Sequence, residues 1–429
     1  MGSMTNFSSI LGSRFAGTFF GAPGEALKLS LPIDGATRTV IDELISAGFQ
    51  PLVVGGAVRD ALLGKTPKDI DIEVHGAESF DELRDALSEL GPLNLTGKSF
   101  GVLKLRVLQA GDKLSEEIDL ALPRRDSKTG EGHRGFTVEV DAQMSLKEAT
   151  SRRDLTVNAL VWDPSSELVI DLNGGLADME AGVLRHVSPA FSEDPLRVLR
   201  VARFAGKLGF APAEETVELS RALLDTFEEL ATERITGELA KLVLEPHLEL
   251  GFNFLQDSGW AGKLGLPLDQ DTLNAQLRTG LSFRGQIDGN PRVLQLALIA
   301  DAVKAQGSED PRRVAGYFAV SQSELKRALA IAGARRARTV NKAVARQWAW
   351  DHQSITAHER LLFEEAVSGQ SSELSLKIYS LLGVLKGAEP DRFDAQAVIS
   401  AHKAANPGLK DGPWIRELLQ EERSKQYAE

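Results

Sequence analysis

The 429-residue sequence contains no cysteine, few aromatic residues and no long hydrophobic run. Without cysteine the chain can form neither disulfide bonds nor a zinc site with thiolate ligands. The seven histidines are scattered, and none has the spacing of paired metal ligands. No apolar stretch reaches the roughly 20 residues that a transmembrane helix needs, so we expect no membrane contact. The chain is long enough for about two to four domains, and it shows no internal repeat.

A glycine-rich turn is the first informative feature. Residues 51–54 have the composition of a buried strand, and residues 57–63 have the pattern of a short helix that stops at a glycine. Gly55 and Gly56 lie between them and allow backbone N–H groups to approach phosphates closely, with Arg59 following on the helix. By itself, such a turn is also a common strand-to-helix connection.

Two aspartates follow this turn after about a dozen residues. In Asp69-Ile70-Asp71 the acidic residues are two apart, so on a strand both carboxylates face the same side and can hold one Mg²⁺ ion. Ile70 and Ile72 then point into the core. An isolated acidic pair commonly faces solvent, but the glycine turn and the pair together predict a phosphoryl-transfer site.

A third carboxylate is expected on a neighbouring strand. Ile118, Leu120 and Leu122 alternate with more polar positions, which places Asp119 on the polar face of a strand. We assign Asp119 to the third position, as a metal ligand or as a base for a 3′-hydroxyl. Glu73 and Glu117 lie on the same strand faces and are rival candidates for the third position. The alternative to a metal site is that all these acidic side chains are simply solvated.

The pattern of the chain changes near residue 172. Strand and helix signals alternate before that point, which implies a mixed sheet with helices, whereas helical spacing dominates afterwards. We therefore predict an α+β fold whose N-terminal head is followed by all-helical segments. The predicted divisions are an extension over 1–39, the head over 40–172, a helical neck over 173–240, a helical body over 241–345 and a helical tail over 346–429.

Several segments further along the chain match known motifs in order. They are Arg152–Leu160, Asp171–Gly175 with Asp178, Glu193–Arg197 and Thr232–Ile235. With the glycine turn and the acidic residues, they make the chain resemble the class II tRNA nucleotidyltransferases, the CCA-adding family related to bacterial poly(A) polymerases. The resemblance covers residues 51 to about 240 and implies a nucleotidyltransferase head.

The resemblance assigns ribose recognition to Arg152, Arg153, Asp154 and Asn158. If residues 148–160 form a helix, Asp154 and Asn158 lie one turn apart on one face, from which both can bond ribose hydroxyls. The same residues also suit an ordinary helix surface with an Arg–Asp pair.

The resemblance assigns base recognition to Asp194 and Arg197, and Arg200 and Arg203 continue on the same helix. Aspartate accepts from an exocyclic amine, and arginine donates to a ring nitrogen or carbonyl. Cytosine and adenine fit this pair, whereas uracil and guanine leave desolvated groups unpaired. Asp194 followed by Pro195 is also the pattern of a helix cap and first helical residue.

Three glycines and alternating charges between residues 123 and 136 favour a mobile loop over a packed element. In similar enzymes a flexible loop at this place helps to switch the site from C to A addition, and CC-only relatives shorten it. Its presence favours CCA or A-only addition, although an ordinary surface loop is the alternative. The charged residues of this loop are Arg124, Arg125, Lys128, His133 and Arg134.

The formal net charge of −12 is unusual for a protein expected to bind RNA. Basic residues nevertheless gather between residues 312 and 346, where they can neutralise several phosphates. A solvated helix face is the alternative interpretation. The residues expected to contact tRNA are Arg335, Arg336, Arg338 and Lys342.

The resemblance implies template-independent addition of C, C and A to the tRNA 3′ end from CTP and ATP, in a cytoplasmic enzyme. Two Mg²⁺ ions on the three aspartates are the only cofactor expected. The triphosphate is expected over the two glycines, with Arg59 near its phosphates. Some relatives carry an HD-type phosphohydrolase domain, but the sequence has no His-Asp dipeptide, so we expect none.

Three alternatives stay open. The closest rival is an A-only adding enzyme that acts after a CC-adding partner. A poly(A) polymerase fits less well, because residues 97–102 stand where such polymerases carry an arginine-rich stretch. A non-catalytic RNA-binding protein would not need the three acids. The sequence does not determine the oligomeric state.

Overall fold

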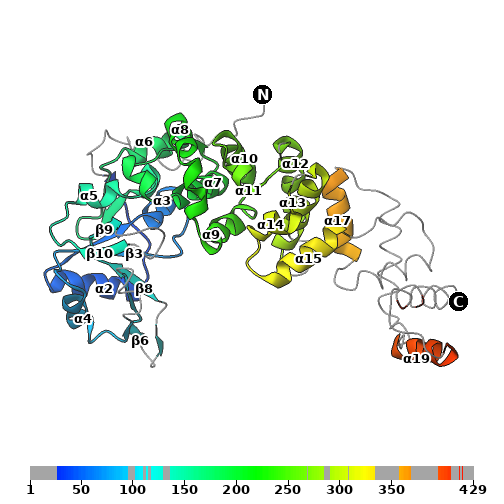
Figure 1. Ribbon diagram of the computed structural model, residues 1–429. Helices are drawn as coiled ribbons and strands as arrows, with labels where there is room; N and C mark the ends of the chain where they lie inside the picture. Colours follow the sequence, from blue (N-terminus) through cyan, green and yellow to red (C-terminus); the bar gives the residue numbers. More distant parts are fainter. Residues whose placement is uncertain are drawn as a thin grey trace. The chain divides into compact units, whose positions relative to one another are not determined.

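The computed structural model describes residues 27–94, 102–109, 113–114, 117–128, 136–267, 269–284, 290–307, 309–333, 357–368 and 395–406, with 415 and 418. Its contacts divide the chain into two compact units (Figure 1). The first unit comprises residues 1–231 with 257–259, and the second comprises residues 232–256 with 260–429.

The first unit is built on an eight-stranded sheet, in the order β1-β12-β11-β2-β3-β8-β5-β4. All neighbouring pairs are antiparallel except β3 and β8, which are parallel. The strands are β1 (Leu27–Lys28), β2 (Gln50–Val54), β3 (Asp71–His75), β4 (Leu93–Asn94), β5 (Val102–Leu105), β8 (Ile118–Ala121), β11 (Val161–Asp163) and β12 (Leu168–Ile170).

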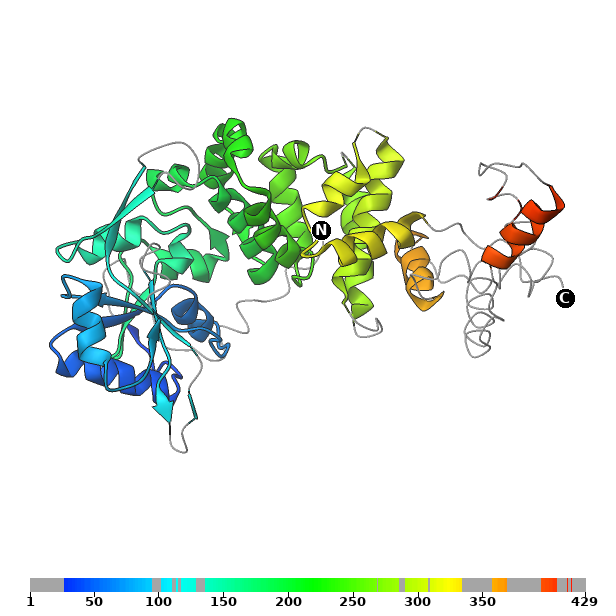
Figure 2. The ribbon, with the colours of Figure 1, turned by 60° about the horizontal axis from the view of Figure 1, so that its bottom comes forward.

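Helices α2 (Gly35–Ser46) and α4 (Phe80–Leu87) lie side by side in both views (Figures 1 and 2). Helix α2 begins where the Asp34 side chain accepts a hydrogen bond from the Thr37 N–H at 2.7 Å, as expected of an N-cap. Val40, Ile41 and Leu44 on its inner face are fully buried. Helix α3 (Gly56–Leu62) directly follows the central strand β2, as the sequence predicted.

The head begins earlier than predicted. Strand β1 pairs with β12, and the buried Trp162 donates from Nε1 to the Leu29 carbonyl at 2.8 Å. Helix α2 also starts at Gly35, inside the segment predicted as an extension. The predicted boundary at residue 39 is therefore wrong, because residues 27–39 contribute to the sheet unit. Residues 1–26 lie outside the described part of the chain.

The rest of the first unit is formed by short helices and small strand pairs. They are β6 (Leu108–Gln109) with β7 (Lys113–Leu114), β9 (Arg124–Lys128) with β10 (Phe136–Val140), α5 (Leu146–Ser151), η2 (Thr156–Asn158), α6 (Gly175–Ala181), β13 (Val183–Leu184) with β14 (Ala211–Pro212), η3 (Pro189–Glu193), α7 (Leu196–Leu208), α8 (Glu214–Ala222) and η4 (Leu224–Glu229).

The helix considered over residues 148–160 does not form as one element. Helix α5 ends at Ser151, and after an extended Leu155 only the 3-10 turn η2 follows. The Asp154 carboxylate accepts from the Leu155 N–H at 2.8 Å, and Leu155 forms a β-bridge with His186. Local side-chain hydrogen bonding of this kind competes with helix formation.

The second unit is entirely helical in its described residues. Its helices are α9 (Thr232–Leu242), α10 (Leu248–Asp257), α11 (Trp260–Leu264), α12 (Gln270–Ser282), α13 (Arg292–Gln306), α14 (Pro311–Gly316), α15 (Gln322–Gly333), α17 (Ala357–Ser368) and α19 (Ala395–Ala405). Helix α13 is packed against α12, α14, α15 and α17, which explains why apolar residues surround its axis. The predicted order, an α+β head followed by helices, is confirmed. No helix within the described ranges is long and apolar enough to span a bilayer.

Candidate active site

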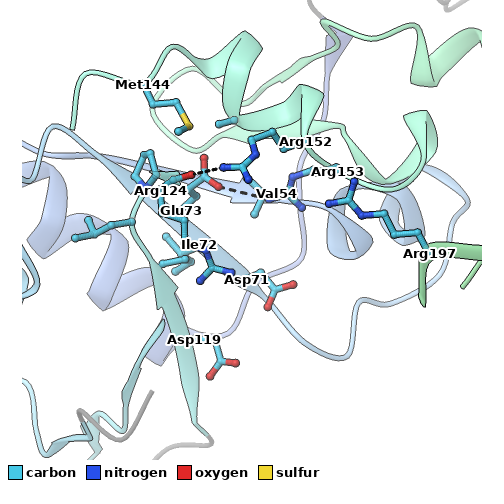
Figure 3. A pocket seen from close by; sticks show the side chains of 14 residues that line it. Val54, Asp71, Ile72, Glu73, Asp119, Arg124, Met144, Arg152, Arg153 and Arg197 are labelled. Atoms are coloured by element: carbon cyan, nitrogen blue, oxygen red, sulfur yellow. Dashed lines mark hydrogen bonds and ion pairs between the residues drawn. The ribbon is translucent and has the colours of Figure 1, made fainter. Parts of the chain in front are cut away.

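Asp71 and Asp119 stand on neighbouring parallel strands. Asp71 opens β3, and Asp119 is the second residue of β8. The two residues are direct partners in the register of this strand pair. Partners in adjacent strands point to the same face of a sheet, so the structure brings these two predicted carboxylates together (Figure 3).

Asp69 lies outside the strand on which it was predicted. Strand β3 starts at Asp71, and the exposed Asp69 is in the irregular segment before it. Ile70, expected in the core, is half-buried, whereas Ile72 is fully buried as predicted. Asp69 is still close enough for its charge to act on Asp71.

The site concentrates negative charge. Desolvation raises the pKa of the Asp71 carboxyl, and the charges of Asp119 and Asp69 raise it further, although Arg153 opposes them. Carboxylates that repel one another in this way are stabilised by a bound cation. The donor set therefore fits a divalent ion at Asp71 and Asp119. Within the described ranges, however, no three His, Cys, Asp or Glu residues are grouped closely enough to ligate one ion.

A lysine accompanies the third carboxylate. Lys104 on β5 is the register partner of Asp119, and its Nζ lies 3.1 Å from Asp119 Oδ1. The same ammonium group lies 2.7 Å from Glu117 Oε1. Lys104 thus pairs with Glu117, a predicted rival for the metal site, which directly precedes β8.

The glycine turn has a backbone that requires glycine. Gly55 has φ +77° and ψ −127°, a combination that residues with a Cβ rarely adopt. A Cβ at this position would also lie 2.8 Å from Nη1 of Arg153. The turn therefore gives the Arg153 guanidinium space to lie across it.

Arg59 does not face the pocket. Its side chain is 2% exposed; its Nε and Nη2 donate to Asp60, and its Nη1 donates to Asn158. The guanidinium also lies over the ring of Phe204, 5.0 Å from the ring centre. This arrangement does not support the predicted contact between Arg59 and the phosphates, because the guanidinium group is buried and bonded to Asp60 and Asn158.

A pocket of about 330 Å³ opens beside Asp71 and Asp119. Its walls carry Glu73 and four arginines, which are Arg124, Arg152, Arg153 and Arg197. Arg152 donates from Nη1 to the Arg124 carbonyl at 2.9 Å. Arg152, Arg153 and Arg197 come from the segment after α5 and from α7, opposite the two acidic strands, whereas Arg124 opens β9 shortly after β8 (Figure 3). An acidic edge thus meets a cationic wall, which is suited to a metal-bound polyphosphate.

Asp154 and Asn158, predicted to read the ribose, form a buried network. Asn158 Nδ2 donates to Asp154 Oδ1 at 3.0 Å, and Arg200 Nε donates to Asp154 Oδ2 at 2.7 Å. Burial raises the pKa of Asp154, but Arg200, Asn158 and the Leu155 N–H lower it more, so its pKa lies below the usual value. The pair meets as predicted, although through a turn rather than along a helix.

The predicted base-reading residues lie at and along α7. Asp194 Oδ1 accepts from the Leu196 N–H at 3.1 Å, but the N-cap of α7 is Pro195, one residue later than the capping interpretation placed it. Arg197 donates from Nη1 to the Ala190 carbonyl at 2.7 Å and lines the pocket. Arg203 lies over the Phe204 ring, 4.1 Å from its centre. Among the predicted arginines of α7, only Arg197 reaches the pocket wall.

The predicted mobile loop is partly a strand pair. Residues 124–128 and 136–140 form the antiparallel ladder β9–β10, so a packed element replaces the ends of the expected loop. Alternating charged and small residues are as compatible with a strand at the edge of a sheet as with a loop. His133 and Arg134 lie outside the described residues, as do the side chains of Arg125 and Lys128. The predicted tRNA-contacting residues also lie outside: Arg335, Arg336, Arg338 and Lys342.

Sequence reasoning missed how Glu73, His75 and Arg153 are connected. The signal was present in the alternation along β3, where Asp71, Glu73 and His75 occupy one face. The contact with Arg153 depends on a distant segment and could not be inferred from that alternation.

Comparison with known proteins supports the resemblance. Residues 52–185 match the poly(A) polymerase head domain, and residues 209–264 match a domain described as the probable RNA- and SrmB-binding site of polymerase A. A multifunctional CCA protein of Pseudomonas aeruginosa is 43% identical over 216 residues, 49% of each chain. One from Neisseria gonorrhoeae is 41% identical over 213 residues, 49% of this chain and 48% of its own. The match thus spans about half the length of these curated relatives.

Solved structures show the same fold. The CCA-adding enzyme of Bacillus stearothermophilus in complex with CTP has a TM-score of 0.62 at 22% identity, covering 91% of this chain and 92% of its own. A CCA-adding enzyme with ATP has a TM-score of 0.62 at 20% identity, covering 92% and 90%. The head-domain sequence is thus similar to that of poly(A) polymerases and CCA proteins, and the fold is similar to that of solved CCA-adding enzymes.

Proposed function

We propose that this protein adds C, C and A to the 3′ end of tRNA from CTP and ATP, with release of pyrophosphate, in the cytoplasm. The observation that carries the proposal is the register of Asp71 and Asp119 beside a pocket walled by arginines. Relatives over the head domain are CCA proteins, and the similar solved enzymes bind CTP or ATP. The pocket volume suits a ligand of nucleoside size.

Nucleotidyltransferases with the kind of head domain that this chain matches are typically metal-dependent. Asp71 and Asp119, with Asp69 beside them, would hold the divalent ions. When bound, such ions activate the attacking hydroxyl and neutralise charge on the leaving pyrophosphate. We place the phosphates over Gly55 and Gly56, where Arg153 lies.

The protein's own residues then orient the nucleotide. Arg152 and Arg153 supply guanidinium donors along the pocket wall, which suits polyphosphate oxygens. Arg197, held by the Ala190 carbonyl, presents a fixed donor for a base acceptor. Together with Asp194, it would favour cytosine and adenine over uracil and guanine. Asp154 is fixed beside them by Asn158 and by Arg200 of α7.

Incorporation into defined tRNAs tests this function. Purified protein is supplied with tRNAs that end before CCA, after C or after CC, together with labelled CTP or ATP. Incorporation of both C and A supports the proposal. Incorporation of A alone, on the CC-ended tRNA, would show the A-only enzyme, and long A tails would show a poly(A) polymerase. Tight tRNA binding without incorporation would show a non-catalytic binder.

A further inference from the structure

Glu73 lies inside the pocket with both carboxylate oxygens engaged. Oε1 lies 2.9 Å from Nε2 of His75, and Oε2 lies 3.6 Å from Nη2 of Arg153. The Glu73 and His75 side chains are only 13% and 12% exposed. Glu73 therefore joins a residue of its own strand to an arginine from the segment after α5.

The two partners of Glu73 agree with this role. Its carboxylate oxygens face the imidazole of His75 and the guanidinium of Arg153. A carboxylate held from one side by its neighbour on the strand can fix a guanidinium group on the other side.

The Arg153 guanidinium lies near two functional parts of the pocket, the Gly55 turn and Asp71. Its Nη1 reaches across the turn, to within 2.8 Å of where a Cβ of Gly55 would be. Arg153 also lines the same pocket as Asp71, the aspartate that opens the same strand as Glu73. Pairing with Asp71 would withdraw both the arginine from the phosphates and a carboxylate from the cation site.

We propose that Glu73, backed by His75, is a positioning residue that holds Arg153 across the Gly55 turn and away from Asp71. The inference rests on the proposed function only in that the pocket takes a nucleoside triphosphate. Arginine loses considerable rotamer freedom when it is ordered, so holding it before binding lowers the cost of binding phosphate. Glu73 acts through Arg153 and is not itself a metal ligand.

Equilibrium binding of ATP and AMP, each with Mg²⁺ and without tRNA, tests the inference. For Glu73→Gln we expect ATP to bind about tenfold more weakly, in line with loss of one charge-assisted contact. AMP lacks the outer phosphates, so its affinity should change by less than about twofold. Glu180→Gln, which neutralises an exposed acid on α6, is the matched control and should leave both affinities unchanged.

A double-mutant cycle with Arg153→Ala separates positioning from other roles. If Glu73 acts through Arg153, the double variant binds ATP no more weakly than Arg153→Ala alone. Additive losses, or equal losses for ATP and AMP, would overturn the inference by showing a direct ligand or a general defect of the pocket. Thermal unfolding of each variant shows whether the pocket is still folded.

The two proposals fail separately. Wild-type protein that binds ATP but extends no tRNA refutes the proposed function and leaves the positioning role intact. Wild-type protein that extends tRNA, together with a Glu73→Gln variant that binds ATP normally, refutes the positioning role alone. Wild-type protein that binds neither nucleotide refutes both.

Discussion

Gly175 is packed against backbone, and its replacement by alanine tests how the turn that carries Asn158 is supported. A Cβ at Gly175 would lie 2.2 Å from the Thr156 carbonyl oxygen and 2.8 Å from its carbon. The Gly175 N–H also donates to Asp171 Oδ1 at 3.1 Å, which limits how far the start of α6 can move. An added methyl group must therefore displace η2, and no flexible side chain can absorb the clash.

The expected loss of stability follows from this geometry. Non-bonded carbon atoms pack at about 3.5 Å, so the backbone at Thr156 must shift on the order of 1 Å. Overpacking of this kind costs about 1–3 kcal/mol and sometimes more, and contact with backbone argues for the upper end. A loss of 3 kcal/mol lowers the melting temperature of a unit of this size by about 6–12 °C.

The adjacent Gly174 supplies a matched control. It has φ +78° but nothing within 4 Å of an added Cβ. Gly174→Ala should therefore cost only about 1 kcal/mol of left-handed backbone strain. Urea and thermal unfolding of the two variants, followed by tryptophan fluorescence, to which the buried Trp162 of this unit contributes, compare them directly. If Gly174→Ala is as damaging as Gly175→Ala, the steric argument is refuted.

Three further outcomes are expected. Asp71→Ala should reduce nucleotide incorporation on the order of a thousandfold while leaving tRNA affinity nearly intact in a filter-binding assay; weaker tRNA binding of similar size would contradict a purely catalytic role. Lys104→Met should lower the Mg²⁺ concentration for half-maximal activity about two- to threefold, because the ammonium group no longer competes for Asp119; an unchanged Mn²⁺ affinity by calorimetry would argue against competition. The pKa of Asp154 is depressed in the folded state, chiefly through Arg200 against the effect of burial, so its stabilising effect is present above about pH 4 and is lost on further acidification. Asp154→Asn should therefore be less stable than wild type at pH 7, and urea midpoints should converge below pH 4; a constant difference would show that the charge is not responsible.

The sequence predicted those features that depend on local alternation. The polar face of β8 follows from Ile118, Leu120 and Leu122, and it placed Asp119 where the structure has it, beside Asp71. The glycine turn was predictable for a similar reason, because a strand, two glycines and a short helix are local features. The broad fold order also follows from periodicity along the chain.

Features that depend on distant contacts were not predictable. Arg59 follows the glycine turn directly, yet it is buried by Phe204 and Asn158, which come from segments far along the chain. The helix expected through Asp154 is interrupted because Leu155 pairs with His186. In both cases a tertiary contact overrides the structure that the local sequence pattern favours.

The parallel pairing of β3 and β8 also constrains how the head folds. Antiparallel neighbours such as β2 and β3 can pair after a short connection, but a parallel pair requires a longer crossover, which here contains α4 and the strands β4 to β7. Closing such a long connection is slow compared with forming a local hairpin. We therefore expect Asp71 and Asp119 to meet late in folding, so that the appearance of divalent-ion affinity during refolding would report completion of the sheet rather than early collapse.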